Sequence, residues 1–136
     1  MRPRNGAKNL TALSPEKARN LRLERQRRDR MSAKELRVQF PQFATLRVDL
    51  VFNDEVSKPP APQSIVLHPP ARAYFVYPCP YAGCSGELDL AANVDDIAAQ
   101  GTDHAEGHIR CSGERHGPHG KALCDLQIEY SIAVGK

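Results

Sequence analysis

The segments YPCPYAGCSGELDL (residues 77–90) and HIRCSGERHGPHGKALCDLQIEYSI (residues 108–132) hold all four cysteines of this 136-residue chain. The cysteines form two pairs, and each pair brackets a loop rich in glycine, proline and polar residues. Strand-like sequence flanks both loops. Two turns that each present two thiols are a common way for a small β protein to surround one tetrahedral metal ion. The candidate metal ligands are Cys79, Cys84, Cys111 and Cys124.

The spacing within the pairs leaves the ligand set open. Four residues separate the first two cysteines, and twelve separate the second two. The longer loop also holds His116 and His119, and imidazole suits zinc as well as thiolate does. We expect four cysteines around one zinc ion. The alternatives are three cysteines with one of these histidines, or four buried thiols without a metal.

The composition favours a metal over disulfides. With 9 glycines, 11 prolines and no tryptophan, the chain has a small core and many loops, and such domains often need a covalent or metal cross-link. No apolar run of signal-peptide length opens the sequence, and none reaches the roughly 18 residues of a membrane span. We therefore expect a cytoplasmic protein without a membrane partner, in which clustered cysteines bind a metal.

The two cysteine loops resemble those of a zinc ribbon, in which two cysteine-containing turns close β-hairpins and a third strand packs alongside. The resemblance covers about residues 76–133. It is carried by Cys79-Pro80-Tyr81 with Cys84-Ser85-Gly86, and by Cys111-Ser112-Gly113 with Cys124. It implies one structural zinc ion and a role in nucleic-acid machinery or in holding protein complexes together. A zinc ribbon usually has about two residues between paired cysteines, so both loops are longer here.

Strand patterns dominate the rest of the body. Strict alternation of apolar and polar residues predicts strands over 45–53 and 126–132. Shorter runs predict strands over 64–67, 73–77, 87–90 and 107–110. The fold class that follows is α+β and mainly antiparallel β, with a zinc-ribbon-like C-terminal half and a helical, basic N-terminal arm. We expect residues 1–31 to form the arm, flexible or helical, and residues 32–136 to form a single β-rich body.

Three helices are expected. Ser14-Pro15-Glu16 predicts a helix start, and the helix that follows has so few apolar residues that we expect it to be solvated or to form on binding a partner. Ser32–Glu35 fits a capping box that opens a second helix through Phe40, with a strand as the alternative. Val94–Gln100 predicts a third helix, capped by Asn93, stopped by Gly101 and with Asp95 and Asp96 in its first turn.

The charge is divided along the chain. Residues 1–38 hold 12 Lys or Arg and 4 Asp or Glu, whereas residues 39–136 hold 7 and 12. Arginine's planar fork suits phosphate oxygens, so the arm predicts a nucleic-acid backbone as partner, with an acidic protein surface or mere solubility as alternatives. The candidate nucleic-acid-binding residues are Arg22, Arg25, Arg27, Arg28 and Arg30.

These observations favour a non-enzymatic zinc-binding protein that associates with nucleic acid through its basic arm. The alternative is a zinc-stabilised adaptor between proteins. No nucleophile motif or phosphate-binding glycine loop is present. The histidines at 104, 108, 116 and 119 would serve an enzyme only around an open metal position, and we interpret them as parts of a solvated loop.

Overall fold

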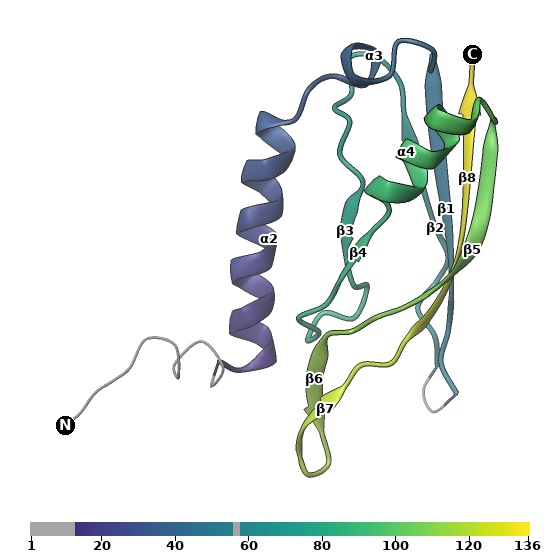
Figure 1. Cartoon of the computed structure of the whole chain (residues 1–136). Helices are drawn as coiled ribbons and strands as arrows, with labels where there is room; N and C mark the ends of the chain where they lie inside the picture. Colours follow the sequence, from purple (N-terminus) through teal and green to yellow (C-terminus); the bar gives the residue numbers. More distant parts are fainter. Residues whose placement is uncertain (1–12, 56–57) are drawn as a thin grey trace.

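The computed structural model describes residues 13–55 and 58–136. A long helix, α2 (Pro15–Ser32), lies beside a β body, and a short helix, α3 (Leu36–Gln39), joins the two (Figure 1). Every strand pairing among the described residues is antiparallel, so the fold is α+β and mainly antiparallel, as predicted. Residues 1–12, the first part of the predicted arm, lie outside the described residues.

The main sheet has four strands in the order β2-β1-β8-β5. These strands are β1 (Thr45–Asn53), β2 (Gln63–Leu67), β5 (His104–Arg110) and β8 (Gln127–Gly135). β1 pairs with β8 along its whole length, from Thr45 opposite Gly135 to Asn53 opposite Gln127. The first β segment of the chain therefore belongs to the same sheet as the last strand.

Alternation puts one face of this sheet in the core. On β1, the side chains of Leu46, Val48, Leu50 and Phe52 are buried, whereas those between them are more accessible. Helix α4 (Ala91–Gln100) crosses the buried face (Figure 1) and contributes Val94 and Ile97 to the core. The other face of the sheet is polar, which is the usual arrangement for an antiparallel sheet with one solvated side.

Two short hairpins carry the cysteine loops. They are β3 (Val76–Pro78) with β4 (Glu87–Asp89), and β6 (Glu114–Gly117) with β7 (Gly120–Leu123). The predicted strand over 73–77 is wrong at its start. The amide of Ala73 donates to the carbonyl of Lys34, so this part of the chain bonds to the connection between α2 and α3 instead of to a sheet.

The predicted start of α2 is confirmed, whereas the predicted start of the second helix is wrong. The hydroxyl of Ser14 accepts from the amide of Lys17 at 3.3 Å, and Pro15 is the first helical residue. The capping box at Ser32 is wrong, because Ser32 still belongs to α2 and its hydroxyl donates to the carbonyls of Arg28 and Asp29. The second helix, α3, begins only at Leu36. No helix in the described part of the chain is both long and apolar enough to cross a membrane.

Helix α4 also begins earlier than predicted. Its first residue is Ala91, whose amide donates to the carboxylate of Asp89 at 2.9 Å. Asn93 is not the cap: it lies inside the helix and donates from its side chain to the hydroxyl of Tyr130 on β8. Asp95 and Asp96 consequently fall beyond the first turn. The predicted stop is confirmed, because Gly101 has a left-handed backbone with φ of 67°.

The alternation on β1 predicts that truncating neighbouring side chains lowers the free energy of unfolding by very different amounts. Leu50 is 1% exposed and Val51 is 43% exposed. Leu50→Ala leaves a cavity in the core and should lower the free energy of unfolding by about 2–5 kcal/mol. Val51→Ala, on the solvated face, should cost less than about 1 kcal/mol. Urea denaturation of both variants measures the difference, and equal losses would contradict the assignment of faces.

Candidate metal centre

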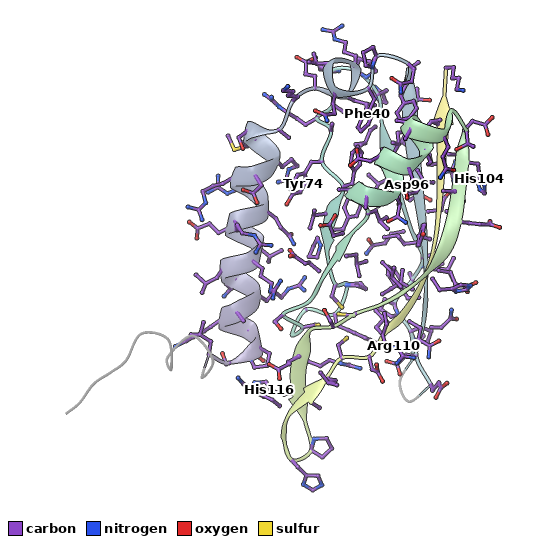
Figure 2. The ribbon with its side chains drawn as sticks, viewed as in Figure 1. Phe40, Tyr74, Asp96, His104, Arg110 and His116 are labelled. Carbon is purple, nitrogen blue, oxygen red and sulfur yellow. The ribbon has the colours of Figure 1, made fainter. Side chains whose placement is uncertain are left out.

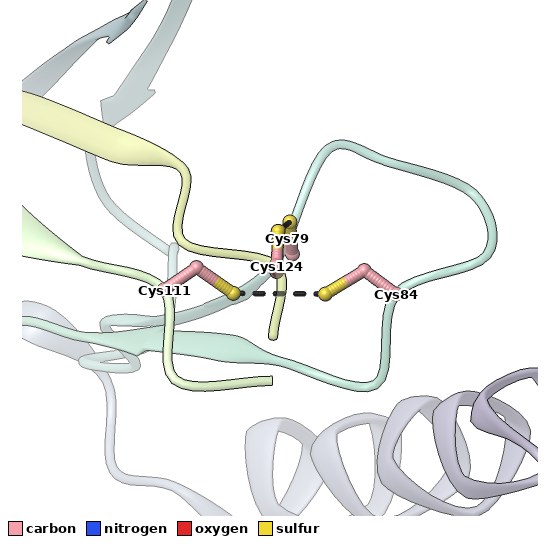
Figure 3. A group of neighbouring side chains, drawn as sticks. All are labelled: Cys79, Cys84, Cys111 and Cys124. Atoms are coloured by element: carbon pink, nitrogen blue, oxygen red, sulfur yellow. Dashed lines mark hydrogen bonds between the residues drawn. The ribbon is translucent and has the colours of Figure 1, made fainter. Parts of the chain in front are cut away.

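The four cysteines converge at the end of the body where the two hairpins meet the main sheet (Figure 3). All four are free and buried, with at most 5% of any residue exposed. Their sulfur atoms all lie within 4.8 Å of one another. The Sγ atoms of Cys79 and Cys124 are 3.8 Å apart, and those of Cys84 and Cys111 are 3.6 Å apart.

These separations fit a tetrahedral metal ion. With zinc–sulfur bonds of about 2.3 Å, the edge of a regular tetrahedron of sulfurs is about 3.8 Å. A disulfide would need a separation of about 2.05 Å. The thiols thus stand where four ligands of one ion would stand, and they are not arranged as two disulfides.

The first pair sits in the loop between β3 and β4. The amide of Cys79 donates to the carbonyl of Gly86 at 3.1 Å, which extends the pairing of the hairpin up to the first thiol. The amide of Cys84 donates to the carbonyl of Tyr81 at 3.0 Å. The amide of Gly86 then points back at the sulfur of Cys84, at 3.3 Å. The loop is therefore a turn that presents both sulfurs to the same side.

The second pair is brought together by a hairpin inserted between its members. The amide of Cys111 donates to the carbonyl of Leu126 and so prolongs the ladder between β5 and β8. The amide of Cys124 donates to the carbonyl of Gly113, where β6 and β7 begin to pair. The twelve-residue spacing is thus explained: β6 and β7 form a hairpin whose two ends both reach the metal centre.

Two glycines let the cysteine loops approach each other. Gly113 repeats the contact made by Gly86, because its amide lies 3.4 Å from the sulfur of Cys111, two residues earlier. A side chain on Gly86 would overlap the sulfur of Cys111, and a Cβ on Gly113 would lie 2.9 Å from the sulfur of Cys84. Both glycines are therefore required by the close approach of backbone and thiols.

The thiols need a cation before all of them can ionise. Contacts with the thiols of Cys111 and Cys79 lower the pKa of Cys84, whereas contacts with those of Cys111 and Cys84 raise the pKa of Cys79. Burial raises the pKa of Cys124. Four adjacent thiolates would repel one another, and a divalent ion would supply the positive charge that stabilises them together.

The histidines of the longer loop are not part of this cluster. His116 lies on β6, and its Nε2 is 2.9 Å from the carboxylate of Glu16 on α2. His119 is exposed in the turn between β6 and β7, and His104 and His108 are exposed on β5. Within residues 13–55 and 58–136, the four cysteines are the one group of at least three candidate ligands whose ligand atoms converge.

No pattern in the sequence indicated the two arginines that support the loops. Nη1 of Arg19 on α2 donates to the carbonyls of Cys79, Tyr81 and Cys84, at 2.8, 2.9 and 3.0 Å. The guanidinium of Arg115 lies 4.1 Å from the ring centre of Tyr81, a cation–π contact that joins the two cysteine loops. The partners of Arg19 are backbone carbonyls 60 or more residues away, which no local pattern indicates.

Arg115 and Tyr81 also share an acidic partner. The hydroxyl of Tyr81 donates to the carboxylate of Asp54, just after β1, and Nη2 of Arg115 lies 3.3 Å from the same oxygen. The side chain of Asp54 is only 7% exposed. This contact ties the end of β1 to both cysteine loops, so the metal centre is braced against the main sheet.

Two of the five predicted nucleic-acid-binding arginines form ion pairs with the body. Glu87 on β4 accepts hydrogen bonds from Arg25 and from the buried Gln26, and Arg22 lies 3.2 Å from its carboxylate. Burial would raise the pKa of Glu87, but the hydrogen bonds from Gln26 and Arg25 outweigh it and hold that pKa below its usual value. The expectation of a freely solvated helix is therefore wrong: α2 is docked through polar side chains.

The other three arginines remain on the solvent side of α2. They are Arg27, Arg28 and Arg30, all exposed. Among the described residues, the one hydrogen bond that their side chains make is the contact between Arg27 and Met31 within the same helix. Whether any of the five arginines binds a nucleic acid stays a prediction.

Comparison with known proteins adds no relative: no protein-family model, curated protein or solved structure matches the chain. The likeness to a zinc ribbon therefore rests on the cysteine cluster itself, which could hold a metal ion.

The glycine contacts give a test that leaves every thiol in place. Gly86→Ala should prevent the four sulfurs from converging, because its methyl group would occupy the position of the Cys111 sulfur. Gly83→Ala is the matched control in the same loop, since its Cβ would come no closer than 3.8 Å to the carboxylate of Glu16. Titration with cobalt(II), followed by thiolate-to-metal absorption, should fail for Gly86→Ala and succeed for Gly83→Ala. Equal titrations would refute the geometry.

Proposed function

We propose that Cys79, Cys84, Cys111 and Cys124 bind one zinc ion whose role is structural. The observation that carries the proposal is the buried set of four sulfurs with separations of 3.6 and 3.8 Å. Four thiolates complete the tetrahedral coordination of zinc and leave no position for a substrate or water. The protein is accordingly proposed to be non-enzymatic, and the ion acts by holding surfaces in place.

The zinc ion would join parts of the fold that lie far apart in the sequence. The loop between β3 and β4 supplies two thiols, and the junction of β5, β6, β7 and β8 supplies the other two. Metal binding and folding are linked in sites of this kind, because the four ligands converge only in the folded chain. Removal of the ion should therefore loosen both hairpins.

This role predicts a loss of stability on metal removal. Purified protein should contain one zinc per chain, and chelation in the presence of a reductant should lower the melting temperature measured by circular dichroism. Cys84→Ser should have the same effect, because it removes one ligand. Ser112→Ala, beside Cys111 but exposed, is the control and should melt like the parent protein. An unchanged melting temperature after complete metal removal would refute the structural role.

We further propose that the exposed arginines of α2 bind the phosphate backbone of a nucleic acid. Three further cations lie near the C-terminal end of α2 and add to the positive charge of Arg27, Arg28 and Arg30. Nη1 of Arg72 donates to the carbonyl of Ala33 at 2.7 Å, which places its charge at the C-terminal end of α2. Lys34 and Arg37 are exposed on the connection to α3 and on α3 itself.

The excess of positive charge over residues 27–37 is the reason to favour a phosphate backbone. Asp29 and Glu35 are the acidic residues of this segment, and Glu35 is paired with Arg37 at 3.2 Å. Binding to phosphates would release counterions and would be independent of base sequence. An acidic protein surface is the competing partner, and a complex with such a protein would survive nuclease treatment.

Electrophoretic mobility shifts with duplex DNA and with RNA across a salt series test the phosphate surface. Each lost phosphate contact on duplex DNA should reduce the slope of log K against log salt by about 0.9. The variant Arg27→Gln/Arg28→Gln should therefore bind more weakly, with a slope smaller by about 2. Arg47→Gln/Arg110→Gln removes the same charge from the main sheet, where these arginines pair with Asp49 and Asp125, and should bind nearly as the parent does. Equal losses in both variants would contradict a specific surface on α2.

A further inference from the structure

Helix α2 is attached to the body by polar contacts and almost no apolar burial. Between Pro15 and Ser32, the buried residues are Pro15 and Gln26. Leu21 and Met31 are 55% and 64% exposed. A helix without a buried apolar stripe receives little stability from packing. Its position therefore depends on what holds its polar side chains.

The attachment that lies nearest to the cysteines is to the backbone of the first cysteine loop. Nη1 of the half-buried Arg19 meets three carbonyls, those of Cys79, Tyr81 and Cys84, within 3.0 Å. Two of the three belong to the proposed metal ligands themselves. Backbone hydrogen bonds shape this loop, and a metal ion bound by the sulfurs of Cys79 and Cys84 would fix its two ends relative to each other.

The remaining attachments also follow the cysteine loops. Glu87, which holds Arg22, Arg25 and Gln26, comes directly after Gly86. Glu16 pairs with His116 on β6, the hairpin that begins next to Gly113. Helix α2 contacts β3 and β6, and Figure 2 shows His116 beside the N-terminal end of α2. Loss of order in the hairpins would remove the partners of the helix together.

The charge of a metal-bound cysteine cluster would also favour the docking of α2. Four thiolates around a divalent ion carry a formal net charge of about −2, and the guanidinium of Arg19 lies against the loop that holds two of them. A partly buried cation beside such a centre is stabilised, because charge interactions weaken less there than in bulk water.

We propose that metal binding at the four cysteines controls the docking of α2, with Arg19 as the residue that couples the two. In the metal-bound protein, the helix is held on the hairpins and presents Arg27, Arg28 and Arg30. In the metal-free protein, the helix separates, and Arg19, Arg22 and Arg25 are released as well. This regulation rests on the proposed metal site. Through it, metal binding would determine which arginines a phosphate backbone can reach.

Hydrogen exchange of the full-length chain, read by mass spectrometry of peptides, tests this directly. In the zinc-bound protein, the amides of residues 19–32 should be protected. Chelation under reducing conditions should raise their exchange rate, and so should Arg19→Met in the presence of zinc. Because a hydrogen bond to a charged group changes an equilibrium constant by about tenfold or more, we expect at least a tenfold increase in the exchange rate. Amides of β1 and β8 report on the core and should stay protected in Arg19→Met.

Arg28→Met is the matched control, since Arg28 lies on the same helix but has no recorded bond to the body; it should leave exchange unchanged. Equal protection of α2 in Arg19→Met and the parent protein overturns the coupling, and so does protection that persists after zinc removal. Loss of zinc affinity in Arg19→Met supports it, because coupling acts in both directions. Metal analysis of the parent protein tests the zinc site separately, and mobility shifts test the phosphate surface, so failure of either proposal is distinguished from failure of the coupling.

Discussion

Four thiols converge where the two hairpins meet the main sheet, and this convergence organises that end of the body. One end of the body has an ordinary core, in which Phe40 stacks on Phe43 with ring centres 5.2 Å apart and also contacts Phe75. At the other end, beyond α4, the hairpins are short and their loops polar. There the four buried cysteines take the place of an apolar core. Only glycine fits at positions 86 and 113, because the neighbouring sulfurs and backbone leave no space for a side chain. A metal ion is the natural partner of such an arrangement.

The position of the basic helix depends on the same constraint. Arginine-rich helices usually stay in solvent, and α2 has the composition of one. It is nevertheless docked, because the cysteine loops supply acceptors on their outer side: three carbonyls for Arg19 and the carboxylate of Glu87 for Arg22 and Arg25. The arginines thus divide into a set that holds the helix and a set that remains available to a partner. The proposed function and its proposed regulation follow from this division.

Much of this could be read from the sequence. The strand over 45–53 was predictable from alternation and has those bounds in the structure, and Gly101 correctly marked the end of α4. The four cysteines were identifiable as one cluster, because all of them flank turns. Ser32 and Asn93 misled as caps, because Ser32 bonds back to carbonyls of its own helix and Asn93 bonds to Tyr130 on another strand. The docking of α2 was not predictable, since its acceptors are backbone carbonyls and one glutamate far along the chain.

In the proposed metal centre, one metal ion is coordinated by these four sulfurs and by nothing else. X-ray absorption spectroscopy at the zinc edge of the purified protein is the decisive measurement. We expect a first shell of four sulfurs at about 2.3 Å, with no nitrogen or oxygen ligand. A shell containing imidazole nitrogen or water oxygen, or a protein that takes up no zinc, would contradict it.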